Sequence, residues 1–322
     1  MADSIRWGIL STANIGKARV APAMQQTRNG RVVAVASRSL DRARAYADEL
    51  GIPTAYGSYE ELIASPDVDA IYNPLPNSEH AVWSIRCAEA GKPTLCEKPL
   101  ARDAAEAQGM VDAFAARGVL FAEAFMYRFH PQTPRVKQML DDRAVGDVRV
   151  VQSTFTFAPR REDDIRLSKP LAGGSLMDVG CYCVNVMRFM LGTEPTKARA
   201  QAAIGARSQV DEMLTGVLSF PGDVLGHFDS GLRVQHTQNY ELRGTRGRIR
   251  VEPGFGMPKD AETVIHYWHE DSCEEIRIPP ANSYILMAED FADALLDGRP
   301  PRFAPQDAVE NMRVIDSLYA SL

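Results

Sequence analysis

The chain has 322 residues, of which 45% are hydrophobic and 24% charged, a composition typical of a soluble globular protein with two domains. Its net charge of -6 argues against nucleic acid or an anionic membrane as the main partner, and no apolar run approaches the ~20 residues that span a bilayer. The first residues carry no signal-peptide pattern, so we expect a cytoplasmic protein, and five cysteines, an odd number, predict no disulfide framework and no metal site.

The first half of the chain alternates short apolar runs with helical stretches. Predicted strands cover residues 6–10, 31–36, 70–73, 94–96 and 119–123, and predicted helices cover 17–27, 41–50, 78–90 and 101–116. Strands that alternate with helices of this length form βαβ units around a parallel sheet. We therefore predict an α/β, Rossmann-type dinucleotide-binding domain over residues 1–123.

The turn after the first strand is a degraded phosphate-binding fingerprint. The pattern G-x-G-x-x-G would place three glycines where the chain has Ser11, Ala13 and Gly16. Ser and Ala are the smallest replacements for the glycine that eases the tight turn and the glycine that admits the pyrophosphate. A helix N-terminus follows and favours anions, so we expect this turn, including Asn14 and Ile15, to bind a dinucleotide.

The end of the second strand indicates which dinucleotide binds. A carboxylate there would select NAD(H) through the ribose 2′-hydroxyl, but the chain has Ser37 and Arg38, with Arg42 one helical turn further on. A hydroxyl and two guanidiniums suit a 2′-phosphate, so we predict NADP(H) as the preferred cofactor, with NAD(H) possible. The alternative is that Ser39 caps the next helix and both arginines are solvated.

A lysine follows the fourth predicted strand, which Pro99 ends after Cys96, Glu97 and Lys98. Ligands of a doubly wound sheet bind beyond the carboxyl ends of its strands. Lys98 is therefore a candidate catalytic residue. The alternative is an ordinary surface lysine in a turn.

The second half contains eight strand-like runs and one long apolar helix. The runs cover residues 148–156, 197–203, 213–220, 224–230, 238–243, 247–252, 263–268 and 274–278, with a hairpin turn over 244–247. The helix is predicted over 175–191, and Asp178, Tyr182 and Asn185 lie on one stripe of it. Gly180 could let a ligand come close, and Asp178 is alternatively the last residue of a capping box that begins at Ser175.

Six motifs, in order along the chain, resemble one enzyme family. They are WGILSTANIG at 7–16, AYGSYEEL at 55–62, YNPLPNSEH at 72–80, CEKP at 96–99, AFMYRFHP at 124–131 and AGGSLMDVGCY at 172–182. From about residue 5 to its end, the chain resembles the glucose-fructose oxidoreductase, inositol dehydrogenase and rhizopine-catabolism (Gfo/Idh/MocA) oxidoreductases. It looks nearest to the aldose dehydrogenases and dimeric dihydrodiol dehydrogenases, because inositol-type members carry histidine at the position of Tyr182.

The resemblance implies an α+β second domain over residues 124–322, built on a large, open, mostly antiparallel sheet that binds substrate and mediates oligomerisation. Because another subunit covers one face of this sheet in the family, we expect a homodimer or a homotetramer. For the cofactor, the resemblance implies contacts from Asn73, Leu75, Pro76, Asn77, His80, Glu97, Lys98 and Arg128. For the substrate, it implies Lys98, Tyr127, Arg166, Asp178 and Tyr182.

Some of these assignments have alternatives. His80 supports the nucleotide loop over 73–77 and is not expected to bind metal. Arg166 shares a charged loop with Arg160 and Arg161, and a solvated loop is the alternative to a substrate contact. His130 either faces the site or simply starts a helix with Pro131.

The activity implied is hydride transfer between a nicotinamide and a hydroxyl carbon of a carbohydrate-like small molecule. Tyr182 would exchange the hydroxyl proton, and Lys98 would supply the charge that makes the phenol a usable base; in a second version Lys98 itself moves the proton. Asp178 would keep Lys98 protonated and orient the hydroxyl. The family also leads us to expect a cis Lys98–Pro99 bond. The competing interpretations are a nucleotide-dependent glycoside-cleaving relative, which usually lacks this lysine, and a non-catalytic NADP(H) sensor.

Overall fold

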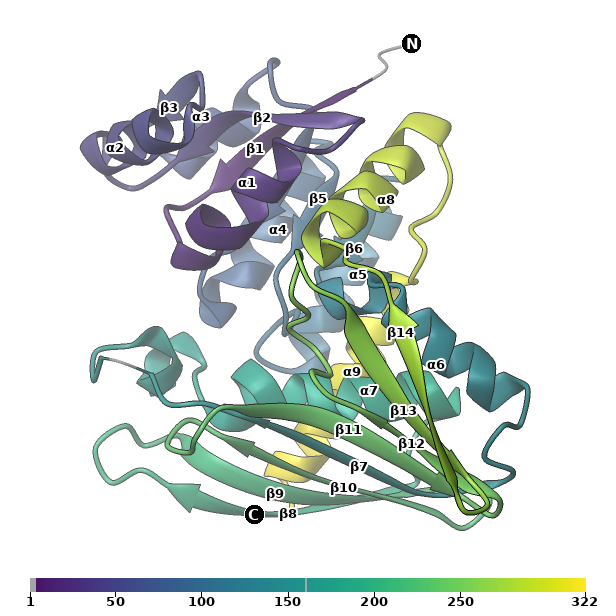
Figure 1. Cartoon of the computed structure of the whole chain (residues 1–322). Helices are drawn as coiled ribbons and strands as arrows, with labels where there is room; N and C mark the ends of the chain where they lie inside the picture. The colour runs from purple at the N-terminus through teal and green to yellow at the C-terminus, as the bar shows by residue number, and fades with distance from the viewer. Residues whose placement is uncertain (1–3, 160) are drawn as a thin grey trace. The chain divides into compact units, whose positions relative to one another are not determined.

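The structure is a computed structural model that describes residues 4–159 and 161–322, so Arg160 lies outside the described residues (Figure 1). Contacts divide the chain into two compact units. The first contains the residues up to Met126 together with Tyr284–Val309, and the second contains Tyr127–Ser283 with Glu310–Leu322. No helix among the described residues is long and apolar enough to cross a membrane.

The first unit is built on a six-stranded parallel sheet in the order β3-β2-β1-β4-β5-β6, as the alternating pattern predicted. Its strands are β1 (Ile5–Leu10), β2 (Gly30–Ala36), β3 (Thr54–Tyr56), β4 (Ala70–Asn73), β5 (Thr94–Cys96) and β6 (Phe121–Glu123). Strand order reverses between β1 and β4, which is where a doubly wound sheet opens a crevice for ligands. The short strand β3 was not predicted.

The helices of the first unit follow the predicted pattern, with changes at their ends. They are a π-helical turn η1 (Gly16–Val20), α1 (Ala21–Met24), α2 (Leu40–Leu50), α3 (Tyr59–Ala64), a 3-10 turn η2 (Asn77–Glu79), α4 (His80–Glu89) and α5 (Ala104–Ala115). The single helix predicted over 17–27 is thus two short helical pieces, and α3 was not predicted.

Helix α8 (Ser283–Asp297) packs on the first unit although it comes late in the chain. Phe291 lies against Trp7 of β1 with ring centroids 5.2 Å apart. The Asn29 amide donates to the Glu289 carbonyl at 3.0 Å and to the Asp293 carboxylate at 2.7 Å. The predicted domain boundary after residue 123 had assigned this segment to the second domain, because nothing local in the sequence indicates the return.

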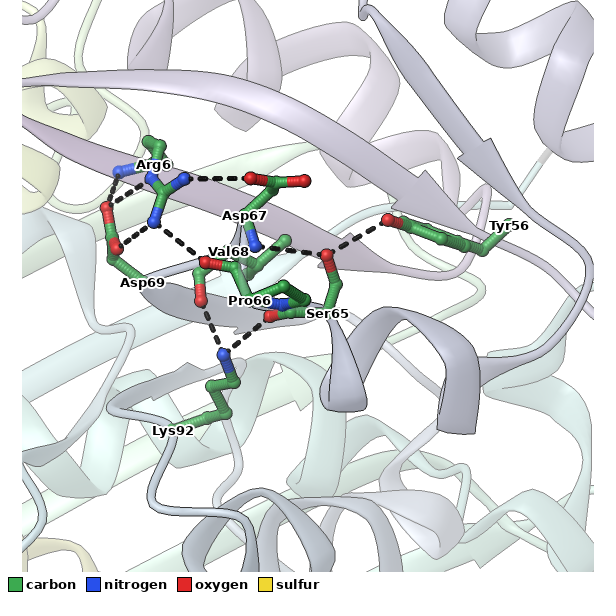
Figure 2. Close-up of polar contacts among 8 residues, drawn as sticks. All are labelled: Arg6, Tyr56, Ser65, Pro66, Asp67, Val68, Asp69 and Lys92. Carbon is green, nitrogen blue, oxygen red and sulfur yellow. Dashed lines mark hydrogen bonds and ion pairs between the residues drawn. The ribbon is translucent and has the colours of Figure 1, made fainter.

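A polar cluster holds the amino ends of the strands in the first unit (Figure 2). The Arg6 guanidinium donates two hydrogen bonds to Asp69, at 3.0 and 2.8 Å. The Lys92 ammonium donates to the carbonyls of Ser65 and Val68, at 2.7 and 2.6 Å. These bonds fix the loop before β4 at the edge of the sheet opposite to its carboxyl ends, so they stabilise the unit without occupying the expected ligand edge.

The second unit is built on an eight-stranded sheet in the order β14-β13-β12-β11-β7-β10-β9-β8. Only the β7/β10 pair is parallel, so the prediction of a mostly antiparallel open sheet is confirmed. The strands are β7 (Val148–Thr156), β8 (Lys197–Ile204), β9 (Asp211–Phe220), β10 (Val224–Gly231), β11 (Thr237–Gly244), β12 (Gly247–Val251), β13 (Thr263–His269) and β14 (Ser272–Ile278). Together the two sheets give the α/β plus α+β fold class that the sequence predicted.

Helices cover one face of this sheet and leave the other open. The helical elements are η3 (Met126–Phe129), α6 (Gln132–Asp141), η4 (Ile165–Leu167), η5 (Lys169–Leu171), η6 (Leu176–Gly180), α7 (Cys181–Leu191) and the last part of α9 (Pro305–Tyr319). Helix α7 lies on β7 and β10 (Figure 1). Along β9, buried Leu214 and Leu218 alternate with exposed Met213 and Val217, as expected for a strand that is covered on one face only.

The helix predicted over 175–191 is divided, and the alternative of a capping box at its start is not borne out, since Ser175 makes no side-chain cap. Leu176–Gly180 is a π-helical turn, and the regular helix begins only at Cys181. The Ser175 hydroxyl donates to Asp211 of β9 at 2.8 Å, and the Leu176 N–H donates to the same carboxylate oxygen at 2.7 Å. Asp211 therefore caps this helix start, from a strand far away in sequence.

Gly180 has a packing role in place of the predicted ligand role. A Cβ atom there would lie 2.9 Å from the Leu176 side chain and 3.0 Å from the Ser230 hydroxyl. The missing side chain thus lets the helix approach β10 closely. Space for a ligand is not what the glycine provides.

Candidate active site

The turn after β1 has the backbone conformation that the glycine fingerprint normally supplies. Ser11 has a φ of 89°, in the region that favours glycine, and its hydroxyl accepts a hydrogen bond from the Ala13 N–H at 3.3 Å. A Cβ atom on Gly16 would lie 2.9 Å from the Tyr46 hydroxyl, so this glycine is needed for packing. Asn14 is exposed and Ile15 is half-buried. The tight turn therefore exists without its first two glycines.

The carboxyl end of β2 presents a buried hydroxyl and two exposed guanidiniums. Ser37 is 3% exposed and its hydroxyl accepts from the Ser39 N–H at 3.4 Å. Ser39 caps α2 by accepting from the Arg42 N–H at 3.4 Å, so the predicted alternative role of Ser39 as a helix cap is confirmed. Arg38 and Arg42 are exposed, and neither forms an ion pair with a residue that the structure describes. Their charge is available to an anion.

The loop after β4 is held by its own side chains. Asn73 is fully buried; its amide oxygen accepts from the Leu75 N–H at 3.2 Å, and its amide nitrogen donates to the Ser84 hydroxyl at 3.0 Å. His80 is also fully buried, with Nε2 2.7 Å from the Leu75 carbonyl and Nδ1 3.0 Å from the Pro99 carbonyl. Burial lowers the pKa of His80 to about 4, so the ring is neutral. Pro76 and Asn77, half-buried, complete this loop.

The Glu97–Pro99 loop follows β5 on the same edge of the sheet. Glu97 is 8% exposed, and its carboxylate accepts from the Tyr72 hydroxyl at 2.6 Å and from the Lys98 N–H at 3.3 Å. The Glu97 N–H donates to the Asn73 carbonyl at 3.0 Å. The Lys98–Pro99 bond is cis, as predicted, and Lys98 is half-buried. The loop that carries Lys98 is thus bonded to the loop after β4.

In the second unit, Asp178 is paired with an arginine of the charged loop. The Arg166 Nε atom donates to the Asp178 carboxylate at 2.8 Å, and Arg166 also pairs with Asp164 at 3.2 Å. The Arg166 guanidinium lies over the Phe157 ring, 5.5 Å from its centroid. The carboxylates, with Asp178 first, raise the pKa of Arg166 further above its ordinary value. Arg166 is therefore held in place by two carboxylates and an aromatic ring.

Tyr182 lies among aromatic rings of the same unit. Phe155 and Phe255 each have centroids 5.4 Å from its ring, and Tyr127 lies at 5.9 Å. The Tyr127 hydroxyl donates to the Asn185 side chain at 2.6 Å, so the third residue of the predicted stripe positions Tyr127. Tyr182 itself is 6% exposed. Its phenol is held by packing on several sides.

Arg128 and His130 are buried in the segment that leads into α6. Arg128 is 4% exposed. His130 is fully buried, its Nδ1 atom accepts from the Gln132 N–H at 3.2 Å, and burial lowers its pKa to about 4. Its carbonyl accepts from the Thr133 N–H at 3.0 Å. The helix-start interpretation of His130 thus accounts for its geometry.

The predicted site residues form two groups, one in each unit. The carboxyl edge of the parallel sheet brings together Ser11, Ala13, Asn14, Ile15, Gly16, Ser37, Arg38, Arg42, Asn73, Leu75, Pro76, Asn77, His80, Glu97 and Lys98. The second unit contributes Tyr127, Arg128, Arg166, Asp178 and Tyr182. Sequence reasoning missed Tyr72 beside Glu97, Phe155 and Phe255 beside Tyr182, and Asp211 beneath the helix. Each is distant in sequence from the residue it supports, and only Tyr72 lies within a motif.

Comparison with known proteins identifies both halves of the chain. Residues 5–125 match an oxidoreductase family with an NAD-binding Rossmann fold, and residues 133–250 match the GFO/IDH/MocA C-terminal domain. A D-xylose 1-dehydrogenase (NADP(+)) of Haloferax volcanii is 41% identical over 98% of this chain and 96% of its own length. A trans-1,2-dihydrobenzene-1,2-diol dehydrogenase of Bos taurus is 34% identical over 86% of this chain and 81% of its own length.

A solved structure gives the same result. A 3-ketoreductase of Actinomadura kijaniata, in complex with NADP and TDP-benzene, is 31% identical, with a TM-score of 0.94 over 99% of this chain and 98% of its own. The family matches cover most of the chain and the curated relatives exceed 30% identity over most of their length. The chain therefore belongs to the GFO/IDH/MocA family of oxidoreductases.

Proposed function

We propose that this protein is an NADP(H)-dependent oxidoreductase that transfers hydride between the nicotinamide and a hydroxyl or keto carbon of a sugar or sugar-like molecule. The observation that carries the proposal is the position of Lys98, on a loop held to the carboxyl edge of a Rossmann sheet. The named activities of the relatives, on xylose, a dihydrodiol and a ketosugar nucleotide, support the substrate class.

The residues of the first unit fit NADP(H). Ser11 has the positive φ that the tight turn of the fingerprint requires, and Arg38 and Arg42 have no ion-pair partner among the described residues. Ser37, Arg38 and Arg42 would hold the 2′-phosphate, and the loops around residues 73–77 and 97–98 would hold the nicotinamide end. In this scheme Asn73 and His80 act by bracing their loop, because their hydrogen bonds are made inside the protein. When bound, NADP(H) supplies or accepts the hydride.

Two side chains would handle the proton that accompanies the hydride. An ordinary phenol, with a pKa of ~10, is a poor base at neutral pH, and lowering that pKa to ~7 takes about 4 kcal/mol. One ammonium ~4 Å away supplies about this much at an effective dielectric constant of ~20. We assign Tyr182 the proton at its hydroxyl oxygen and Lys98 the charge. Direct proton transfer by Lys98 is the second version of the same chemistry.

Asp178 has a partner that the sequence did not predict. Its carboxylate forms an ion pair with the Arg166 guanidinium, whose positive charge offsets the negative charge of Asp178. We propose that this ion pair binds hydroxyls of the substrate next to Tyr182.

Solved variants of the Actinomadura ketoreductase favour the pairing of this lysine with this tyrosine. One of these variants has a substituted lysine and another a substituted tyrosine, and the two positions are separated by the same number of residues as Lys98 and Tyr182 here. The sensor alternative predicts nucleotide binding without turnover. It offers no reason for a half-buried lysine and a phenol surrounded by rings to occupy these positions.

The experiment follows NADPH or NADP⁺ absorbance with a panel of aldoses, polyols, keto-sugars and dihydrodiols. Lys98→Met and Tyr182→Phe should each lower kcat at least about a hundredfold, as expected for loss of general acid–base catalysis, while NADPH affinity stays near that of the wild type. Asp164→Asn, which alters a neighbouring partner of Arg166, is the control with modest loss. Substantial turnover by the Lys98→Met variant would rule the mechanism out, and nucleotide binding without any turnover by the wild type would favour the sensor.

We further propose that the protein forms a homo-oligomer through the open face of the second-unit sheet. The exposed face of β9 and β10 carries three large apolar side chains, Met213, Val217 and Leu225. A surface of this kind is typical of interfaces. Dimer and tetramer remain alternatives, and the cytoplasmic location stays a prediction.

A further inference from the structure

Tyr59, the first residue of α3, lies close to the end of β2. The Ser37 N–H donates to the Tyr56 carbonyl at 3.2 Å, which joins the ends of β2 and β3. Ser58 caps α3 by accepting from the Glu61 N–H at 3.2 Å. These two bonds set where α3 begins. They place Tyr59 next to the segment that carries Arg38.

The Tyr59 ring is fixed by packing. Tyr59 is 6% exposed and meets Trp83 edge to face, with centroids 4.8 Å apart and an interplanar angle of 82°. Trp83 is itself held, since its Nε1 donates to Glu79 at 3.2 Å and Arg86 lies 4.5 Å from its ring centroid. A tyrosine held in this way has one place for its hydroxyl.

The electrostatics of this hydroxyl agree with that placement. Burial raises the pKa of Tyr59, and the positive charges of Arg38 and Arg42 oppose that rise. The bond between the ends of β2 and β3 and the packing of α3 on β2 place Tyr59 beside the segment that carries Arg38. Neither guanidinium has an ion-pair partner among residues 4–159 and 161–322. A phenol oxygen can accept a hydrogen bond from a guanidinium without neutralising its charge.

We propose that Tyr59 is a positioning residue that determines selectivity for NADP(H) over NAD(H), by holding the Arg38 guanidinium where the 2′-phosphate binds. The inference rests on the proposed function, which assigns the phosphate to Arg38 and Arg42. An exposed arginine loses side-chain entropy when it is ordered on a ligand. A partner that orders it beforehand removes part of that cost, and only a nucleotide with a 2′-phosphate benefits.

The experiment is titration of NADPH and of NADH by fluorescence, without substrate. Tyr59→Phe keeps the ring against Trp83 and removes only the hydroxyl. We expect the Kd for NADPH to rise about three- to tenfold, the effect of one lost hydrogen bond, while the Kd for NADH changes less than about twofold. A general structural defect would weaken both nucleotides, so equal losses overturn the inference, as does an unchanged Kd for NADPH.

Tyr56→Phe is the matched control. Tyr56 lies three positions before Tyr59 in the chain. Its hydroxyl donates to the Ser65 hydroxyl at 3.0 Å, within the polar cluster of Figure 2. This variant also removes one tyrosine hydroxyl from the same unit. It should leave the ratio of the two dissociation constants unchanged, and a selectivity loss as large as that of Tyr59→Phe would overturn the assignment to Tyr59.

A second variant separates this inference from the proposed function. Arg38→Ala should weaken NADPH selectively, and adding Tyr59→Phe to it should cause little further loss, because Tyr59 acts through Arg38. Fully additive losses would overturn the positioning role. If Arg38→Ala leaves NADPH affinity unchanged, the proposed phosphate site itself is wrong. If Arg38→Ala weakens NADPH binding and Tyr59→Phe does not, only the role of Tyr59 is wrong.

Discussion

Single residues in this protein replace functions that a motif usually assigns to glycine. Ser11 stands at the first glycine position of the fingerprint and adopts a φ of 89°. Its small side chain also accepts the Ala13 N–H, so it contributes a hydrogen bond that glycine lacks. The turn therefore has the geometry of the fingerprint although its residues differ. A sequence pattern restricted to glycine would have missed the site.

The conformation of Ser11 leads to a prediction. Ser11→Val places a β-branched side chain at a positive φ, which should destabilise the fold by about 1–2 kcal/mol and weaken NADPH binding because the turn is distorted. Urea unfolding and nucleotide titration measure the two effects. Thr12→Val, a substitution at the next position, is the control that should change both much less. Equal effects of the two variants would show that the φ of Ser11 has no special importance.

Asp178 illustrates how far a single residue can be interpreted from sequence. Its position in a helical segment was predicted correctly. Its partner Arg166 was not predicted, because this arginine lies on a loop twelve positions earlier, and a loop residue has no fixed spacing to a helix. Ion pairs between a loop and a helix depend on the tertiary fold. They leave no periodic signal.

At the scale of elements, local patterns predicted strands better than helix starts. The strands 94–96 and 148–156 have the predicted bounds, because turn residues or a proline border them. The π-helical turn at Leu176–Gly180 was not visible, since its residues are as apolar as those of the regular helix after it. The capping box failed for a related reason. The residues at 175–178 fit a capping box. In the structure, however, the Ser175 hydroxyl donates to the Asp211 carboxylate of β9 and not to its own helix.

The cap supplied by Asp211 leads to a prediction at this scale. Its carboxylate accepts from Ser175, from the Leu176 N–H and, at 2.8 Å, from the Tyr319 hydroxyl. Asp211→Ala leaves these buried donors unsatisfied and should cost about 1–3 kcal/mol or more in urea unfolding. Because this helix carries Tyr182, turnover should fall as well, while NADPH affinity should not. Ser317→Ala, which removes an exposed hydroxyl of α9, is the control.

Asp211 also makes a specific contribution to pH dependence. Burial raises its pKa above the ordinary value of 3.8, although the three hydrogen bonds oppose the rise. The folded state therefore binds this proton more tightly than the unfolded state does. The contribution of Asp211 to the free energy of unfolding should fall as the pH rises from about 4 through the folded pKa. Asp211→Asn should remove this fall in urea titrations across pH 4 to 7, and an unchanged pH slope in that variant would contradict the assignment.

At the scale of the whole molecule, the chain leaves its first unit and returns to it. Residues 284–309 follow all strands of the second sheet in sequence but belong to the first unit. Their helix α8 contacts Trp7 and Asn29 there. The order of βαβ units predicted the first sheet, and the spacing of strand-like runs predicted the second. The packing of α8 on the first unit could not be predicted from the sequence. This helix has one apolar face, like many others, and nothing in that pattern indicates which sheet it covers.

The open face of the second sheet carries exposed apolar side chains and is the proposed interface between subunits. Val217 of β9 is 48% exposed and stands opposite His227 of β10, near exposed Leu225. If two copies meet across this face with twofold symmetry, Val217→Glu introduces a charge on both sides of one interface.

We expect light scattering after gel filtration to give the molar mass of a dimer or tetramer for the wild type. The Val217→Glu, Leu225→Glu double variant should have a smaller molar mass. Val82→Glu on α4, where the valine is 49% exposed, should not change the mass. A monomeric wild type at micromolar concentration, or an unchanged mass in the double variant, would show that this face does not hold the subunits together.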